Sequence, residues 1–322
     1  MKSDWGRATV RKATDAARDV RLISLVPEQG HRRAMPGAHV DVEVTIGGVA
    51  RRRSYSVVDD ADGAWTIAVR HLPNGRGGSR LMCALQPGDT LRIAPPESHF
   101  GLSPSGPGYL LIAGGIGITP LIGMARLLAT RAPLRLLYAG RSRTHMPFLN
   151  ELQTMLGDRL EVFAGDEGRR LDLPSAFAGL HLDGEAYLCG PAALLDAARA
   201  AWREAGRSPA QLRFETFGSG GGAEAEPFRV HVRDHDMTVE VPRDMSLLDT
   251  LAGAGIELAY DCLRGECGLC AIDVVGAAVL DHRDVFLSAE QRHQGRTICA
   301  CVSRASGEIT VDTGYRPALA RG

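Results

Sequence analysis

Three cysteines within nine residues constrain this chain more than any other feature of its sequence. In the stretch DCLRGECGLCAIDVV, four residues separate Cys262 from Cys267 and two separate Cys267 from Cys270. Thiolates with these gaps, followed by a fourth some thirty residues later, are typical of a plant-type [2Fe–2S] site. Gly265 and Gly268 lie between the ligands, where they let the backbone wrap closely enough for amide N–H groups to reach the cluster sulfurs.

A structural zinc site is the main alternative for these thiols. It would usually contain two separated Cys-x2-Cys pairs, whereas here one pair has an extra cysteine upstream. The odd total of seven cysteines argues against a disulfide scaffold. The fourth thiol is either Cys299 or Cys301 in the stretch TICACVSRA, and both point to the same side if that stretch is extended.

The bulk composition sets the broad class of protein. A chain of 322 residues with 44% apolar and 23% charged residues is typical of a soluble protein with two or three domains. The net charge of −1 gives no electrostatic reason to bind nucleic acid. The N-terminus shows no apolar secretion signal, and no apolar run is long enough to span a membrane. We therefore expect a cytoplasmic monomer with neither a membrane nor a nucleic-acid partner.

Residue patterns divide the chain into three domains. Short alternating runs at 40–46, 52–58, 65–72 and 89–96, with Gly- and Pro-rich turns between them, predict strands of an antiparallel β-barrel. A continuous apolar strand, a helix and a second strand then begin a doubly wound α/β domain with a parallel sheet. The stretch GSGGGAEAEP reads as a flexible linker, and a small α+β domain with the cysteines follows. The predicted boundaries are 1–104 for the barrel, 105–217 for the α/β domain, 218–227 for the linker and 228–322 for the last domain.

Two stretches of the predicted barrel suit a flavin. In RRRSYSVVDD, Arg53 can pair with a phosphate, Tyr55 offers a flat face to the isoalloxazine ring, and Ser56 can hydrogen-bond the N5 edge. Further on, GRGGSRLMCAL presents backbone N–H groups at a helix N-terminus, where a phosphate can bind. The full predicted flavin set is Arg53, Ser54, Tyr55, Ser56, Arg70, Gly77, Gly78 and Ser79.

The α/β domain carries the features of a nicotinamide site. In GGIGITP, Gly115 and Gly117 follow a strand and let a pyrophosphate approach, Thr119 can reach flavin or nicotinamide, and Pro120 suits a first helical turn. The stretch YLCGP adds Cys189, Gly190 and Pro191.

Two pairs of charged residues give opposite indications of the coenzyme. Asp166, with Glu167 after it, can accept from a ribose hydroxyl and repel a 2′-phosphate, whereas Arg141 and Arg143 would favour that phosphate.

Together these motifs resemble one known family across nearly the whole chain. RSYS, GGIGITP and CGP match the ferredoxin reductase superfamily, while LDHRDVFLSAEQ and CVSRA resemble the C-terminal ferredoxin domain of phthalate dioxygenase reductases and their relatives. The resemblance implies a β-grasp fold for the last domain. It implies Cys301 as the fourth ligand, because the family's last ligand directly precedes the VSRA-like tetrapeptide. It also implies FMN, because the ferredoxin domain comes last, and NADH as the coenzyme.

The resemblance also implies residue roles and a function. Cys189 would lie beside the nicotinamide as a polarising group, and Phe217 in FETFGSG would lie against the flavin; both also read as ordinary core residues. The implied catalytic set is Ser56, Thr119, Cys189 and Phe217. Electrons would pass from NADH through FMN and the cluster to a terminal (Rieske-type) aromatic-ring dioxygenase or O-demethylase. A cytochrome P450 is an alternative partner, and a stand-alone electron carrier or redox sensor is an alternative function.

Overall fold

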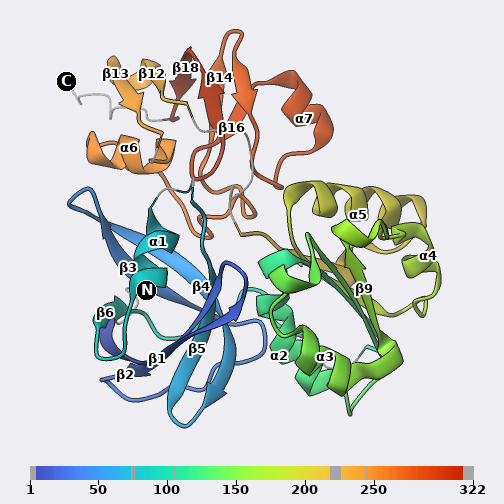
Figure 1. The fold of residues 1–322 in the computed structure, drawn as a ribbon. Helices are drawn as coiled ribbons and strands as arrows, with labels where there is room; N and C mark the ends of the chain where they lie inside the picture. The colour runs from blue at the N-terminus through green and yellow to red at the C-terminus, as the bar shows by residue number, and fades with distance from the viewer. Residues whose placement is uncertain are drawn as a thin grey trace. The chain divides into compact units, whose positions relative to one another are not determined.

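The N-terminal strands close into an antiparallel barrel in the computed structural model (Figure 1), which describes residues 5–73, 75, 77–103, 106–217, 226–243 and 245–314. The strands are β1 (Gly6–Ala17), β2 (Val20–Pro27), β3 (His39–Ile46), β4 (Val49–Ala61), β5 (Ala64–Arg70) and β6 (Thr90–Ile93). Their order around the barrel is β1-β2-β5-β4-β3-β6. Side chains at alternate positions point inward, and Val40, Val42 and Ile67 are fully buried in the barrel core. Helix α1 (Gly78–Ala84) adds Met82 to this core.

Strands β1 and β2 were not predicted from the sequence. Charged residues interrupt β1, and its pairing with β2 shifts register between Val10 and Lys12 and again between Asp15 and Ala17. Each shift breaks the period of two on which strand prediction depends. The four strands predicted from 40–46, 52–58, 65–72 and 89–96 correspond to β3, β4, β5 and β6.

The next segment forms a five-stranded parallel sheet in the order β11-β10-β7-β8-β9. Its strands are β7 (Tyr109–Gly114), β8 (Leu134–Gly140), β9 (Leu160–Ala164), β10 (Glu185–Cys189) and β11 (Leu212–Glu215). Its helices are α2 (Thr119–Leu128), α3 (Leu149–Leu156), α4 (Leu173–Ala178) and α5 (Ala192–Glu204). Figure 1 shows α2 and α3 on one side of the sheet and α4 and α5 on the other. From α2, Arg126 donates to the carbonyl of Val58 in β4 at 2.5 Å and so joins this sheet to the barrel.

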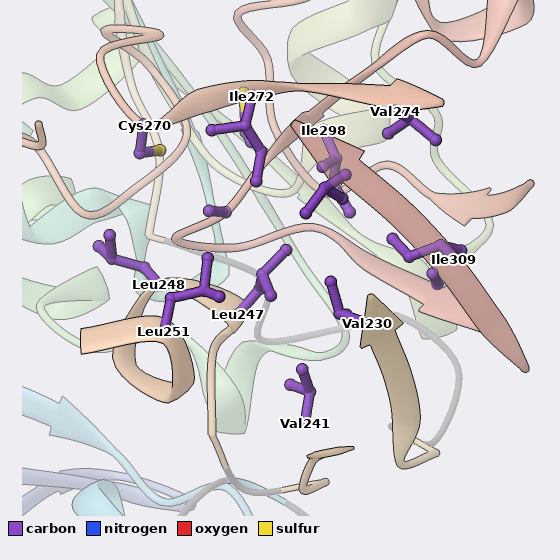
Figure 2. Packing of buried hydrophobic residues seen from close by; sticks show 14 of the residues in the cluster. Val230, Val241, Leu247, Leu248, Leu251, Cys270, Ile272, Val274, Ile298 and Ile309 are labelled. Carbon is purple, nitrogen blue, oxygen red and sulfur yellow. The ribbon is translucent and has the colours of Figure 1, made fainter. Parts of the chain in front are cut away.

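The C-terminal segment contains a five-stranded mixed sheet in the order β13-β12-β18-β14-β16 and a two-stranded sheet of β15 and β17. The strands are β12 (Phe228–Val232), β13 (Met237–Val241), β14 (Ala271–Val275), β15 (Val279–Asp281), β16 (Thr297–Cys299), β17 (Arg304–Ser306) and β18 (Glu308–Asp312). The helices are α6 (Leu247–Gly253) and α7 (Ala289–Gln294). Figure 2 shows side chains of α6 and of the sheet in one apolar core, with Cys270 among them.

Single helical turns of the 3-10 type occur between these elements. They are η1 (Gly115–Ile118), η2 (Arg143–His145), η3 (Gly157–Arg159), η4 (Gly165–Glu167), η5 (Pro209–Gln211) and η6 (Arg233–His235).

The predicted fold class is confirmed: a barrel, a doubly wound parallel sheet and an α+β segment follow one another along the chain. The chain forms two compact units, Met1–Glu215 and Thr216–Gly322. The barrel and the parallel sheet therefore belong to one unit. The finer domain boundaries stay predictions, because residues 104 and 105 and residues 218–225 of the expected linker lie outside the described ranges.

Candidate functional site

Three of the cysteines meet where β14 and β16 begin and end. Cys270 directly precedes β14, Cys299 ends β16, and Cys301 lies in the turn that follows β16. The two strands are antiparallel, with Ala271 opposite Cys299, and the amide of Ala300 donates to the Cys270 carbonyl at 3.1 Å. Strand pairing thus brings together thiols that are about thirty residues apart in the chain.

The loop from Cys262 to Cys270 directs backbone amides at a sulfur atom. The Sγ atom of Cys262 accepts hydrogen bonds from the amides of Arg264, Glu266 and Cys267, each at 3.4 Å. Burial raises the pKa of Cys262, and these three amides act against that rise. Amide donors around a thiolate are the chemistry that an iron–sulfur ligand requires.

Close contacts with neighbouring residues explain why two positions of this loop are glycine. Gly265 has a φ of 77°, and a Cβ on it would lie 2.8 Å from the Cα of Asp284. Gly268 has a φ of 76°, and a Cβ on it would overlap the ring of Phe286. Only glycine adopts this backbone conformation without strain, so both positions favour it.

Both candidates for the fourth ligand approach the sulfur of Cys270. Hydrogen bonds from the thiols of Cys299 and Cys301 lower the pKa of Cys270 to about 3. The pKa values of Cys299 and Cys301 are raised for the same reason, because each thiol donates to Cys270. Cys301 also accepts a hydrogen bond from the amide of Gly265, inside the loop that holds Cys262 and Cys267.

The donor set fits a two-iron cluster. Cys270, Cys299 and Cys301 are each less than 5% exposed, and Cys262 and Cys267 are half-buried beside them. Within the described ranges, no three His, Cys, Asp or Glu side chains are arranged around the position of a single metal ion. A cluster of two irons takes four thiolates over a wider space, which this loop and the turn after β16 can supply.

The residues after Cys301 tie the turn to the rest of its unit. Ser303 donates to the buried carboxylate of Asp284 at 2.9 Å. The guanidinium of Arg304 donates to the carbonyls of Glu226, Pro242 and Met245 at 2.9, 2.9 and 2.7 Å. The VSRA stretch, noted in the sequence only as a family feature, is therefore a structural anchor.

On the barrel, β4 carries the predicted flavin residues. Ser54 donates to the carboxylate of Asp41 at 2.5 Å. Ser56 is buried, and its hydroxyl has no hydrogen-bond partner in the described part of the chain. An unpaired buried hydroxyl costs stability unless a ligand completes it, so Ser56 fits a flavin contact. Tyr55 packs against the barrel core, and burial raises its pKa, so that the phenol stays neutral.

The two predicted phosphate-binding pieces of the barrel come together. A Cβ on Gly78, at the start of α1, would lie 3.0 Å from Nε of Arg53. The guanidinium of Arg53 thus reaches the helix start that follows Gly77. The hydroxyl of Ser79 is already engaged, because it accepts from the amide of Leu72 at 3.1 Å. Arg70 ends β5 and is exposed.

The two predicted nicotinamide loops are adjacent at one edge of the parallel sheet. Cys189 of β10 lies opposite Ala113 of β7. A Cβ on Gly114 would lie 2.6 Å from Cδ of Pro191, and a Cβ on Gly117 would overlap the carbonyl of Cys189. This edge is the carboxyl end of the strands, where doubly wound sheets bind their ligands.

The residues that close this edge are buried. The hydroxyl of Thr119 donates to the carbonyl of Ile116 at 3.0 Å, and Pro120 occupies the first turn of α2. Cys189 is fully buried. Gly115 and Gly190 complete the two loops that meet here.

The conflicting charges after β8 and β9 are partly neutralised by an ion pair. Arg143 donates from Nε and Nη2 to the carboxylate of Glu167 at 2.5 and 3.1 Å. This pairing holds the pKa of Glu167 below its usual value. The amide of Asp166 donates to the carbonyl of Arg141 at 3.2 Å, which brings the two loops side by side.

Phe217 and Thr216 begin the second unit. Phe217 is half-buried, whereas Thr216 is only 7% exposed. The hydroxyl of Thr216 donates to the carbonyl of Arg264 at 2.8 Å, and its amide donates to the carboxylate of Glu266. Sequence reasoning missed these contacts, because neither the residue types nor their separation of about fifty positions forms a recognisable pattern.

Within the described ranges, no helix combines the length and apolarity needed to cross a membrane.

Comparison with known proteins supports the two kinds of site. Residues 7–101 match the family model described as an oxidoreductase FAD-binding domain, and residues 230–306 match that of a 2Fe-2S iron-sulfur cluster binding domain. The chain is 36% identical over 304 residues to the heme-dependent oxidative N-demethylase beta subunit of Ectopseudomonas mendocina (strain ymp). This alignment covers 93% of this chain and 95% of the relative.

Phthalate dioxygenase reductase is similar in both sequence and structure. The protein from Burkholderia cepacia is 31% identical over 322 residues, covering 95% of this chain and 97% of the relative. A solved phthalate dioxygenase reductase, described as a modular structure for electron transfer from pyridine nucleotides to [2Fe-2S], matches with a TM-score of 0.78 at 29% identity. That match covers 96% of this chain and 98% of the other.

Proposed function

We propose that this chain, which belongs to the phthalate dioxygenase reductase-like family of oxygenase reductases, passes electrons from NADH through FMN and a [2Fe–2S] cluster to a terminal oxygenase. The family membership makes it a flavin- and iron–sulfur-dependent oxidoreductase. The choice of FMN, of NADH and of a Rieske-type aromatic-ring dioxygenase or O-demethylase as partner is our proposal.

The contact between Gly117 and the Cys189 carbonyl carries the proposal furthest. It joins the GGIGITP loop to the CGP loop at the carboxyl edge of the sheet, inside the same compact unit as the barrel. A pyrophosphate can approach the backbone at such a glycine-lined edge. This arrangement favours a coenzyme-dependent reductase over an electron carrier or redox sensor without a coenzyme.

On the barrel, each flavin residue has a distinct task. Arg53, beside the start of α1, would hold the flavin phosphate by charge and by paired hydrogen bonds. Tyr55 would cover one face of the ring system. The unpaired hydroxyl of Ser56 would form a hydrogen bond with the polar edge of the flavin. We propose Thr119 and Cys189 as the groups that confine the nicotinamide to its side of the flavin.

In the second unit, Cys262, Cys267, Cys270 and Cys301 would hold the cluster. The amides of Arg264, Glu266 and Cys267 already donate to the Cys262 sulfur, and the core around Cys270 keeps water from one side of the site. When bound, the flavin accepts the two electrons of a hydride, and the cluster carries electrons one at a time. The protein contributes binding, orientation and electrostatics.

An anaerobic titration of the purified full-length chain with NADH tests the proposal. We expect bleaching of both the flavin and the iron–sulfur absorption bands, together with iron, sulfide and FMN released in stoichiometric amounts on denaturation. No bleaching with either NADH or NADPH would contradict the proposed reductase. Release of FAD in place of FMN would correct the flavin and leave the reductase function standing.

A further inference from the structure

The cysteine loop is held from outside by the first residue of its own compact unit. Thr216 donates its hydroxyl hydrogen to the carbonyl of Arg264 at 2.8 Å, and its amide donates to the carboxylate of Glu266. Both acceptor residues lie between Cys262 and Cys267. Thr216 is 7% exposed and Arg264 is 8% exposed, so water competes little for these hydrogen bonds.

The two residues that Thr216 holds are also donors to a cysteine sulfur. The amides of Arg264 and Glu266 each lie 3.4 Å from the Sγ atom of Cys262. The side chains of the same two residues approach each other, with Nε of Arg264 3.7 Å from the nearer carboxylate oxygen of Glu266. Residues 264–266 are therefore fixed between Thr216 on one side and the sulfur on the other.

Amides that donate to a cluster ligand favour the reduced cluster. Reduction adds negative charge to the irons and their sulfurs, and a nearby N–H dipole stabilises that charge. The effect depends on the direction of the N–H group, because hydrogen bonds weaken steeply as they bend. A residue that restrains the segment carrying two such amides therefore acts on the cluster without contacting it.

We propose that Thr216 is a positioning residue for the cluster: by holding Arg264 and Glu266 it keeps their amides directed at Cys262 and so raises the reduction potential of the cluster. The inference rests on the proposed function, since it takes Cys262 as a ligand of a [2Fe–2S] cluster. It adds a residue outside the cysteine loop, and outside the region of 230–306 that matches the cluster-binding family model.

Replacing Thr216 by valine tests the inference in the holoprotein. Thr216→Val keeps the shape of the side chain and removes the donor to Arg264. We expect the equilibrium constant for one-electron reduction of the cluster to fall by roughly threefold to tenfold, the upper value being a shift of about −59 mV. The electron paramagnetic resonance spectrum of the reduced cluster should change as well. Thr216→Ser restores the hydroxyl and should restore both readouts.

Thr250→Val is the matched control. The hydroxyl of Thr250 donates to the carbonyl of Ser246, the N-cap of its own helix α6, at 2.9 Å in the same unit. We expect the cluster of this variant to keep its potential and its spectrum. An unchanged potential in Thr216→Val, or an equal shift in Thr250→Val, would overturn the inference.

Glu266→Ala gives an independent measurement if Thr216→Val holds too little cluster to titrate. This change removes the acceptor of the Thr216 amide and leaves the Glu266 N–H in place. Because this change also removes a negative charge, which by itself raises the potential, Glu266→Gln is measured beside it: that variant loses the same charge and keeps an acceptor oxygen. A lower potential in Glu266→Ala than in Glu266→Gln supports the inference, and equal potentials overturn it. A wild-type chain that contains no iron and sulfide would instead contradict the proposed function, so the two failures are distinguishable.

Discussion

Gly117 lies so close to the backbone carbonyl of Cys189 that any residue with a Cβ atom at position 117 would collide with it. A Cβ on Gly117 would overlap both the oxygen and the carbon of that carbonyl, which is backbone and cannot swing away. Through Gly117, η1 is thus in direct contact with the end of β10. The coenzyme site that we propose depends on this contact, because it sets the spacing of the two loops.

Gly117→Ala should therefore impair use of the coenzyme. The two loops would have to separate, and displacements of that kind reduce rates by roughly ten- to hundredfold. We expect that loss in kcat/KM for NADH, measured with ferricyanide as acceptor, while the cluster content stays at the wild-type level.

Gly123→Ala provides the comparison for that change. Gly123 lies in α2, and its new methyl group would meet Pro36 at an ordinary distance of 3.5 Å. Alanine in a helix is more stable than glycine by up to about 1 kcal/mol, so this variant should melt slightly higher and keep its kcat/KM. Equal losses in both variants would contradict the role given to the Gly117 contact.

Ser56→Ala should separate flavin binding from stability. The Ser56 hydroxyl is buried without a partner in the described part of the chain, so its removal should leave the flavin-free protein as stable as before or more stable. Flavin binding should weaken by roughly threefold to tenfold if the hydroxyl bonds the flavin. Thermal melting of the flavin-free protein measures the first effect, and fluorescence titration with flavin measures the second.

Ser54→Ala is the counterpart on the same strand. Ser54 donates to the carboxylate of Asp41, so its loss should lower the melting temperature of the flavin-free protein. If Ser56→Ala destabilises the flavin-free protein as much as Ser54→Ala does, the Ser56 hydroxyl has a partner within the protein and the flavin contact fails.

Serine substitutions should distinguish the two cysteines that approach Cys270. We expect Cys301→Ser to lose most of its iron and sulfide or to show an altered cluster spectrum, because Cys301 also contacts the Gly265 amide of the loop. Cys299→Ser should retain a cluster with four cysteine ligands. Iron and sulfide analysis with electron paramagnetic resonance checks both, and the reverse result would assign the ligand to Cys299.

The ion pair between Arg143 and Glu167 should control coenzyme preference. Glu167→Gln removes the carboxylate that pairs with Arg143, and with it one negative charge that would repel a 2′-phosphate. We expect the ratio of kcat/KM for NADPH to that for NADH to rise several-fold. A change of that size corresponds to about 1 kcal/mol in relative binding of the two coenzymes, because each 1.4 kcal/mol is about a factor of ten.

Glu161→Gln controls for the loss of charge alone. Glu161 pairs with Arg135 at 2.6 Å in the same sheet, and that pair is also solvent-exposed. The coenzyme ratio of this variant should match the wild type. A rise in both variants would mean that overall charge, rather than the guanidinium of Arg143, sets the preference.

Local patterns in the sequence were sufficient to predict the strands and helices whose apolar residues recur at a regular spacing. The strand YLLIAGG, the helix after it and the alternating barrel strands all satisfy this condition, and the cysteine spacing is itself a local pattern. Strand β1 does not, because two register shifts interrupt it. Charged residues also interrupt it, so no regular alternation marks it as a strand.

Contacts between distant residues were beyond the reach of sequence patterns. Arg143 and Glu167 were read as opposing indications of the coenzyme, yet they form one ion pair across 24 positions. The approach of both Cys299 and Cys301 to Cys270 depends on the pairing of β14 with β16 and on the turn that follows. Such contacts depend on how strands pair, and no single stretch of sequence contains that information.

The hydrogen bonds of Thr216 and Arg304 bear on how a gene for such a protein can be recombined. Thr216 is bound to the cysteine loop, and the carbonyl of Glu226 is bound by Arg304, so both flanks of 218–225 are attached to the same unit. A crossover placed within the glycine-rich stretch would cut off one of these attachments. A cysteine-containing unit transplanted into another protein should therefore begin before Thr216, well upstream of residue 230, where its match to the cluster-binding family model starts.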